Sequence, residues 1–171
     1  MNLTRHATSY LPPRGSVLLL SCMDLRFLDE ITGFMNHDNL ANRYDHVILA
    51  GAAFGALGAP GGKDECGNAL EMPHWKETFF NHLFAAIKLH DISDVYILQH
   101  RNCGAFHKFF HITKDFTDTN EDQAEEKNEH LKYAKLLETE IESWVHERCP
   151  ERNLRVRSFL MELRGNVVEL D

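Results

Sequence analysis

Short apolar runs alternate with a longer helical pattern through the first hundred residues. Three runs have the length of buried strands, namely Ser16–Ser21, Asp45–Gly51 and Asp94–Leu98. Between the last two, a helix is predicted to begin at Pro73, because proline is tolerated in the first turn of a helix. Apolar side chains then recur at helix spacing and predict a face that packs in the core, made of Phe79, Phe80, Leu83, Phe84 and Ile87.

The last fifty residues predict a long helix followed by two strands. Residues 121–148 have an amphipathic pattern with one densely charged face, and Pro150 ends the helix. Leu154–Leu163 and Val167–Leu170 are strand-like, and the Gly165-Asn166 pair between them indicates a hairpin. We therefore expect an α/β fold with a mainly parallel central sheet, an antiparallel edge strand and flanking helices. The apolar side chains of the long helix are Leu131, Ala134, Leu137, Ile141, Trp144 and Val145.

We expect a single domain over residues 1–171, because this length is close to the usual size of one domain. Residues 1–14 form a short polar arm ahead of the first strand. The glycine-rich stretch Gly51–Gly62 lacks the residues of a nucleotide-binding loop, and we interpret it as a flexible loop. Thr113–Glu126 contains few apolar residues and is predicted to be a polar, mobile connection.

Charge and hydropathy exclude several classes of partner. Eighteen Lys and Arg against 26 Asp and Glu give a net charge of −8, which argues against nucleic-acid binding. No apolar run is long enough to span a membrane. The apolar core of Val17–Leu20 is also too short for a secretory signal, so we expect a cytoplasmic location.

Two clusters of metal-ligating side chains each follow a predicted strand. Cys22-Met23-Asp24-Leu25-Arg26 comes after the first strand, and His100-Arg101-Asn102-Cys103-Gly104 comes at the end of the third. In a parallel sheet, ligands gather outside the carboxyl ends of the strands, so these clusters converge if the two strands are neighbours. Two thiolates and one imidazole suit zinc and leave its fourth tetrahedral position open, as a catalytic zinc requires.

Asp24 and Arg26 place one acidic and one basic side chain beside the expected metal ligands. Cys22 and Asp24 lie on the same side of an extended segment, so Asp24 can reach the metal or its open position. Arg26 can pair with Asp24 and keep the carboxylate ionised. The chemistry that fits this arrangement is a metal-bound water that loses a proton near neutral pH and becomes a hydroxide nucleophile.

These two motifs resemble those of the β-class carbonic anhydrases. That family has Cys-x-Asp-x-Arg after its first strand and His-x-x-Cys-Gly after its third, and the long helix followed by a strand hairpin is also similar. The resemblance implies that Cys22, His100 and Cys103 hold Zn²⁺ and that Asp24 and Arg26 form the catalytic pair beside it. It implies homodimers or dimers of dimers. It also implies an inactive state in which the aspartate occupies the fourth zinc position and leaves the arginine.

The activity implied is that of a carbonate dehydratase, a zinc lyase. It hydrates CO₂ reversibly to bicarbonate, with zinc hydroxide as the nucleophile. The backbone N–H of Gly104, next to a metal ligand, is the expected contact for the substrate bicarbonate. Two other functions stay open, because the stretch Ile48–Gly55 lacks the Arg and Asn that usually follow the second strand in this family. One is hydrolysis of carbon disulfide or carbonyl sulfide, and the other is a non-catalytic, structural zinc protein.

Other His and Cys residues offer weaker alternatives. Cys103, His107 and His111 repeat every four residues and would form a metal-binding stripe if a helix begins after Cys103. Either histidine is alternatively a relay that carries protons from the site to buffer, since the pKa of imidazole is near neutrality. Cys66 is interpreted as a loop thiol, and Cys149 as a residue at the end of a helix.

Overall fold

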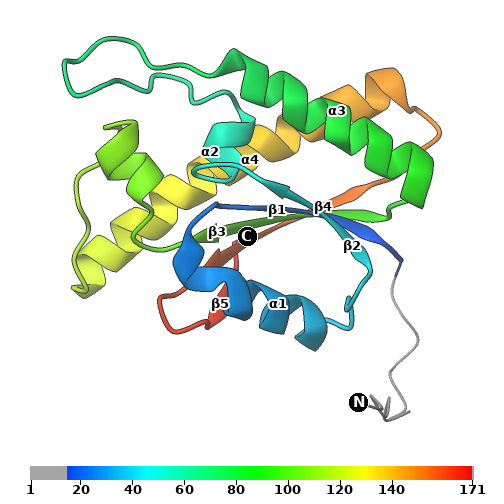
Figure 1. Ribbon diagram of the computed structural model, residues 1–171, viewed down its shortest axis with the longest axis horizontal. Coiled ribbons are helices and arrows are strands. Elements are labelled where there is room, and N and C mark those ends of the chain that lie inside the picture. Colours follow the sequence, from blue (N-terminus) through cyan, green and yellow to red (C-terminus); the bar gives the residue numbers. More distant parts are fainter. Residues whose placement is uncertain (1–14, 171) are drawn as a thin grey trace, which may run out of the picture.

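A computed structural model describes residues 15–170 of the protein, and its central feature is a five-stranded sheet (Figure 1). The strands lie in the order β2-β1-β3-β4-β5. All neighbouring pairs are parallel except β4 and β5, which are antiparallel. The predicted fold class and the terminal hairpin are therefore confirmed. The strand bounds are β1 (Val17–Ser21), β2 (Tyr44–Ile48), β3 (Asp94–His100), β4 (Arg155–Met161) and β5 (Val167–Glu169).

Helices cover both faces of this sheet (Figure 1). Helix α1 (Leu28–His37) lies against one face. Helices α2 (Ala53–Ala56), α3 (Pro73–His90) and α4 (Asn120–Arg148) lie against the other. The expected arm, residues 1–14, lies outside the described residues, as does residue 171. Within residues 15–170, no helix combines the length and the apolar character needed to cross a bilayer.

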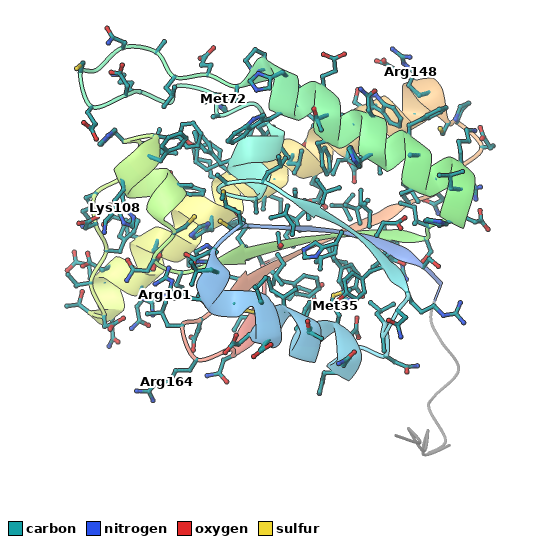
Figure 2. All side chains as sticks on the ribbon, viewed as in Figure 1. Met35, Met72, Arg101, Lys108, Arg148 and Arg164 are labelled. Atoms are coloured by element: carbon teal, nitrogen blue, oxygen red, sulfur yellow. The ribbon has the colours of Figure 1, made fainter. Side chains whose placement is uncertain are left out.

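The two covered faces explain why β1 is apolar throughout. Successive side chains of a strand point to opposite faces of the sheet. Accordingly, Leu18 and Leu20 pack in the cluster formed with α3 and α4, whereas Val17 and Leu19 pack in the cluster formed with α1. All four are at most 1% exposed. Figure 2 shows Met35 on the α1 side of the sheet. Its side chain is fully buried and packs in the cluster formed with α1.

The strand order places a crevice at the ends of β1 and β3. From β1 the chain continues to β2 on one side and then returns to β3 on the other side. Such a change of direction in an open α/β sheet leaves the carboxyl ends of the two central strands without a crossing connection, and ligands bind there. The two predicted clusters lie at these strand ends. Residues 22–26 follow β1, and residues 100–104 begin with the last residue of β3.

The glycine-rich stretch after β2 was predicted to be a loop, but part of it is helical. It contains the short helix α2, whose four residues are all buried. The Phe54 ring packs edge-on against the Tyr133 ring of α4, at a centroid distance of 5.0 Å. A Cβ at Gly55 would clash with the backbone oxygen of Ala50. Small residues here allow the backbone to approach its neighbours closely, which sequence hydropathy does not reveal.

Two further predictions need correction, and one helix was missed. The polar connection Thr113–Glu126 is shorter than expected, because α4 begins at Asn120 and Glu126 is buried in it. Phe84 is 45% exposed rather than in the core, since it lies at the rim of α3 beside Trp144. Helix α1 was not predicted at all. Its buried residues Ile31 and Met35 lie one helical turn apart, a signal that the sequence does contain.

Candidate metal centre

Two thiols and one imidazole meet at the crevice between β1 and β3. Cys22 directly follows β1, His100 is the last residue of β3, and Cys103 follows three residues later. The sulfur atoms of the two cysteines are 3.8 Å apart, and the three ligand atoms lie within 4.8 Å of one another. The three residues are 8%, 4% and 3% exposed. Among residues 15–170 they form the one group of three or more such side chains close enough to share an ion.

The His100 ring is held in place by the backbone of the residue that follows it. Its Nδ1 lies 2.9 Å from the carbonyl oxygen of Arg101. A carbonyl only accepts hydrogen bonds, so Nδ1 carries the ring proton and Nε2 presents its lone pair. This Nε2 is buried and has no hydrogen-bond partner among residues 15–170. A buried imidazole nitrogen without a partner, aimed at two thiols, is the arrangement expected of a metal ligand.

The two thiols influence one another's ionisation. The hydrogen bond with Cys103 lowers the pKa of Cys22, and the nearby His100 and the Gly51 backbone N–H, 3.3 Å from the Cys22 sulfur, act in the same direction against burial. The pKa of Cys103 is raised by that same bond to Cys22 and by burial. These opposite pKa shifts favour the thiolate form at Cys22 and the protonated thiol at Cys103. A divalent cation between them would let both ionise, because its charge compensates both.

The spacing of the donors fits zinc. With Zn–S bonds of about 2.3 Å, two sulfur atoms of a tetrahedral site lie about 3.8 Å apart. The distance between the Cys22 and Cys103 sulfurs has this value without any movement of the backbone. Three protein donors leave one tetrahedral position for water or substrate, whereas structural zinc sites have four protein donors. The residues thus could hold a metal ion with one open position.

Asp24 and Arg26 form an intact pair beside these donors. The guanidinium of Arg26 donates to both carboxylate oxygens of Asp24, at 2.9 and 2.7 Å. These bonds hold the pKa of Asp24 below its ordinary value, so the carboxylate is ionised at neutral pH. Oδ2 of Asp24 lies 3.8 Å from Nε2 of His100, so the carboxylate lies next to the three donors. Arg26 is anchored in turn by a 3.0 Å bond to the carbonyl of Asn102.

The alternative stripe of Cys103, His107 and His111 does not form a metal group. A π-helical turn, η2 (Ala105–Phe109), follows Gly104 in place of an α-helix. Nε2 of His107 lies 3.2 Å from a carboxylate oxygen of Asp115, and His111 is exposed with a left-handed backbone. A proton-relay role for either histidine stays a prediction. Cys66 is exposed and Cys149 is buried at the end of α4, and neither joins the group among the described residues.

Sequence reasoning missed the groups that hold the loop between His100 and Cys103. Glu126 of α4 accepts a 2.9 Å bond from Nε of Arg101 and a second bond from the backbone N–H of Asn102. Figure 2 shows Arg101 at the end of the sheet, beside the first turns of α4. The Gly51 N–H that reaches Cys22 was missed as well. A buried acid in an acid-rich segment gives no local signal, because its partner lies 25 residues away.

Comparison with known sequences gives relatives without a stated activity. No family model matches the chain. An uncharacterized protein of Rickettsia bellii is 29% identical over 156 residues, covering 91% of this chain and 82% of its own length. An uncharacterized protein of Rickettsia conorii is 28% identical over 156 residues, covering 91% of this chain and 72% of its own length. In both relatives the similarity spans most of this chain and more than two thirds of the relative.

Comparison with solved structures identifies the fold. The β-carbonic anhydrase CafD of the filamentous fungus Aspergillus fumigatus matches in its wild-type form with a TM-score of 0.56 and 14% identity, over 96% of this chain and 95% of that one. A mutant of CafD gives a TM-score of 0.58 at the same identity, over 96% and 94% of the two chains. The fold is therefore that of the β-carbonic anhydrases, as the two motifs indicated.

Proposed function

We propose that this protein, which has the fold of the β-carbonic anhydrases, catalyses the zinc-dependent reversible hydration of CO₂ to bicarbonate. One observation carries the proposal. Cys22, His100 and Cys103 present three buried donors within 4.8 Å of one another, with the two sulfurs 3.8 Å apart, and an intact Asp24–Arg26 pair lies beside them. A purely structural zinc site has no need of an ionised carboxylate held at its open side.

The three donors would hold the ion, and the neighbouring residues would direct the reaction. Zinc held there would lower the pKa of a water molecule towards neutrality and so supply the hydroxide that adds to the carbon of CO₂ to give bicarbonate, with the proton of the water going to solvent. The thiolates of Cys22 and Cys103 offset the charge of the ion, so the protein buries no uncompensated charge.

Asp24 has the position of a group that aims the nucleophile. Its carboxylate can accept a hydrogen bond from the attacking O–H, which turns an oxygen lone pair towards the substrate. Arg26 keeps the carboxylate in place through two bonds and keeps it ionised. The backbone N–H of Gly104 is proposed as a donor to bicarbonate. A Cβ built at this glycine would meet no atom within 4 Å, so space is open beside it.

Stopped-flow measurement of CO₂ hydration, combined with metal analysis, tests this function. We expect about one zinc per chain, activity that disappears when a chelator removes the metal, and recovery when zinc is added back. A zinc-loaded protein that hydrates no CO₂ would refute the proposal. In that case the same preparation is assayed with carbon disulfide and carbonyl sulfide, because Ala50, Ala52 and Ala53 place no polar side chain after β2. Inactivity towards all three would leave a structural zinc protein.

We also propose that the working form is a homodimer in which the second copy covers the rim of the site. Three large apolar side chains flank the Asp24–Arg26 pair, and Met23, Leu25 and Leu28 are 66%, 81% and 59% exposed. Monomeric proteins rarely expose such a cluster. A second copy that covers this rim would exclude water from the neighbourhood of the donors.

Leu25→Asp is therefore expected to separate the dimer. Each buried leucine contributes about 1.5–3 kcal/mol, so loss of one from each copy weakens the dimer about 10²- to 10⁴-fold. Sedimentation equilibrium gives the masses of wild type and variant. Leu89→Asp is the matched control, because Leu89 is 74% exposed near the end of α3, at the opposite end of the strands. A monomeric wild type, or a Leu25→Asp variant that stays dimeric, would contradict the proposal.

A further inference from the structure

We infer that Glu126 is a positioning residue for the metal centre, acting on His100 through the peptide group between Arg101 and Asn102. This inference rests on the proposed zinc site. Glu126 is 1% exposed on α4 and lies outside both motifs. Within α4, all of which the structure describes, it is the only acidic side chain among the buried residues.

One peptide group connects the carboxylate to the imidazole. The carbonyl of this peptide belongs to Arg101 and accepts the hydrogen bond from Nδ1 of His100. Its N–H belongs to Asn102 and donates to Oε1 of Glu126. The peptide is planar, with its C=O and N–H pointing in opposite directions, so a group that holds the N–H also fixes the direction of the C=O. Glu126 thereby sets the orientation of the ring whose Nε2 faces the two sulfurs.

The backbone at Asn102, between His100 and Cys103, has a conformation that depends on contacts with other parts of the protein. Asn102 has a φ of +57°, in the left-handed region that residues other than glycine rarely adopt. The Glu126 carboxylate satisfies the N–H of this strained residue, and Arg26 binds its carbonyl. Both sides of Asn102 are thus fixed. The bond from Glu126 fixes the peptide whose carbonyl holds His100. The bond from Arg26 connects the loop to the Asp24–Arg26 pair.

The contacts of Arg101 distinguish this role from that of an ordinary ion pair. Nε of Arg101 donates to Oε2 of Glu126 at 2.9 Å, and Nη2 reaches Asp118, which is 78% exposed, at 3.3 Å. An ion pair that only joined α4 to the sheet would need just the first bond. Here, Oε1 of Glu126 also accepts a hydrogen bond from the backbone N–H of Asn102 in the loop. Its negative charge also polarises the peptide and strengthens the acceptor that faces His100.

Zinc affinity measured by competition with a chromogenic chelator tests the inference. We expect Glu126→Gln, whose uncharged amide has one acceptor oxygen for the two bonds from Arg101 and Asn102, to weaken zinc binding about 10-fold, the lower end of the usual cost of disturbing a group that orients a metal-ligating histidine. Asp118→Asn removes the other acidic partner of Arg101 without touching the peptide, and it should change the affinity less than about twofold. The visible spectrum of the cobalt(II) form should change in Glu126→Gln and stay constant in Asp118→Asn.

A double variant separates positioning from folding. Arg101→Met combined with Glu126→Leu removes both buried charges at similar volume, which proteins usually tolerate. It also removes the acceptor for the Asn102 N–H, so zinc binding should weaken at least as much as in Glu126→Gln. If the double variant binds zinc as tightly as the wild type, with an unchanged cobalt spectrum, the inference is overturned. If the wild type itself binds no zinc, the proposed function fails instead.

Discussion

Cys22→Ser is expected to abolish zinc binding and CO₂ hydration together. Serine is close to cysteine in shape, but its hydroxyl keeps its proton near neutral pH and is a poor ligand for zinc. The site then retains two donors, His100 and Cys103. Since groups that merely orient a ligand change affinity 10- to 100-fold, loss of a ligand should lower activity at least about 10³-fold. Elemental analysis after dialysis and stopped-flow hydration on the same sample measure both quantities.

Cys66→Ser is the matched control for this prediction. Cys66 is an exposed thiol in the loop between α2 and α3, outside the metal group. The same exchange there should leave zinc content and rate at wild-type values. Wild-type zinc content in Cys22→Ser would show that Cys22 is no ligand. Loss of zinc with an unchanged hydration rate would show that the metal is not part of the reaction.

The sheet and the group of candidate metal ligands could be predicted from the sequence because both have local signals. A strand buried on both faces is a continuous apolar run, and β1 and β3 each consist of buried residues only. Each run ends at a cluster with metal-ligand spacing. Parallel strands then bring Cys22 and His100 to the same edge of the sheet. The two clusters were therefore expected to converge, and the sulfur atoms of Cys22 and Cys103 lie 3.8 Å apart.

The parts that were missed depend on contacts between distant residues. A pattern of apolar residues shows which face of α3 turns inwards but not how far the neighbouring elements extend, so Phe84 was expected in the core. Glu126 belongs to a segment rich in acidic residues, and such segments are usually solvated. Its burial is possible because Arg101 supplies a compensating charge, and 25 residues separate the two.

Asp24→Asn is expected to separate catalysis from metal binding. The variant should keep about one zinc per chain, because Cys22, His100 and Cys103 are unchanged. Its CO₂ hydration should fall about 10²- to 10⁴-fold, the usual contribution of a positioned acid–base group. Asparagine has one acceptor oxygen where the carboxylate has two, and its NH₂ group cannot accept the bond from the N–H groups of Arg26. The attacking O–H would then lose its charged acceptor.

The fold should survive this exchange. Asp24 also caps the short helix η1 (Leu25–Phe27) by accepting a 3.1 Å bond from the backbone N–H of Arg26, and asparagine is an equally good cap. The melting temperature should therefore stay within a few degrees of the wild type. Asp29→Asn, at an exposed position in the first turn of α1, is the control and should leave both zinc and activity unchanged. If Asp24→Asn keeps its zinc and hydrates CO₂ within about twofold of the wild-type rate, the carboxylate cannot be the group that directs the nucleophile.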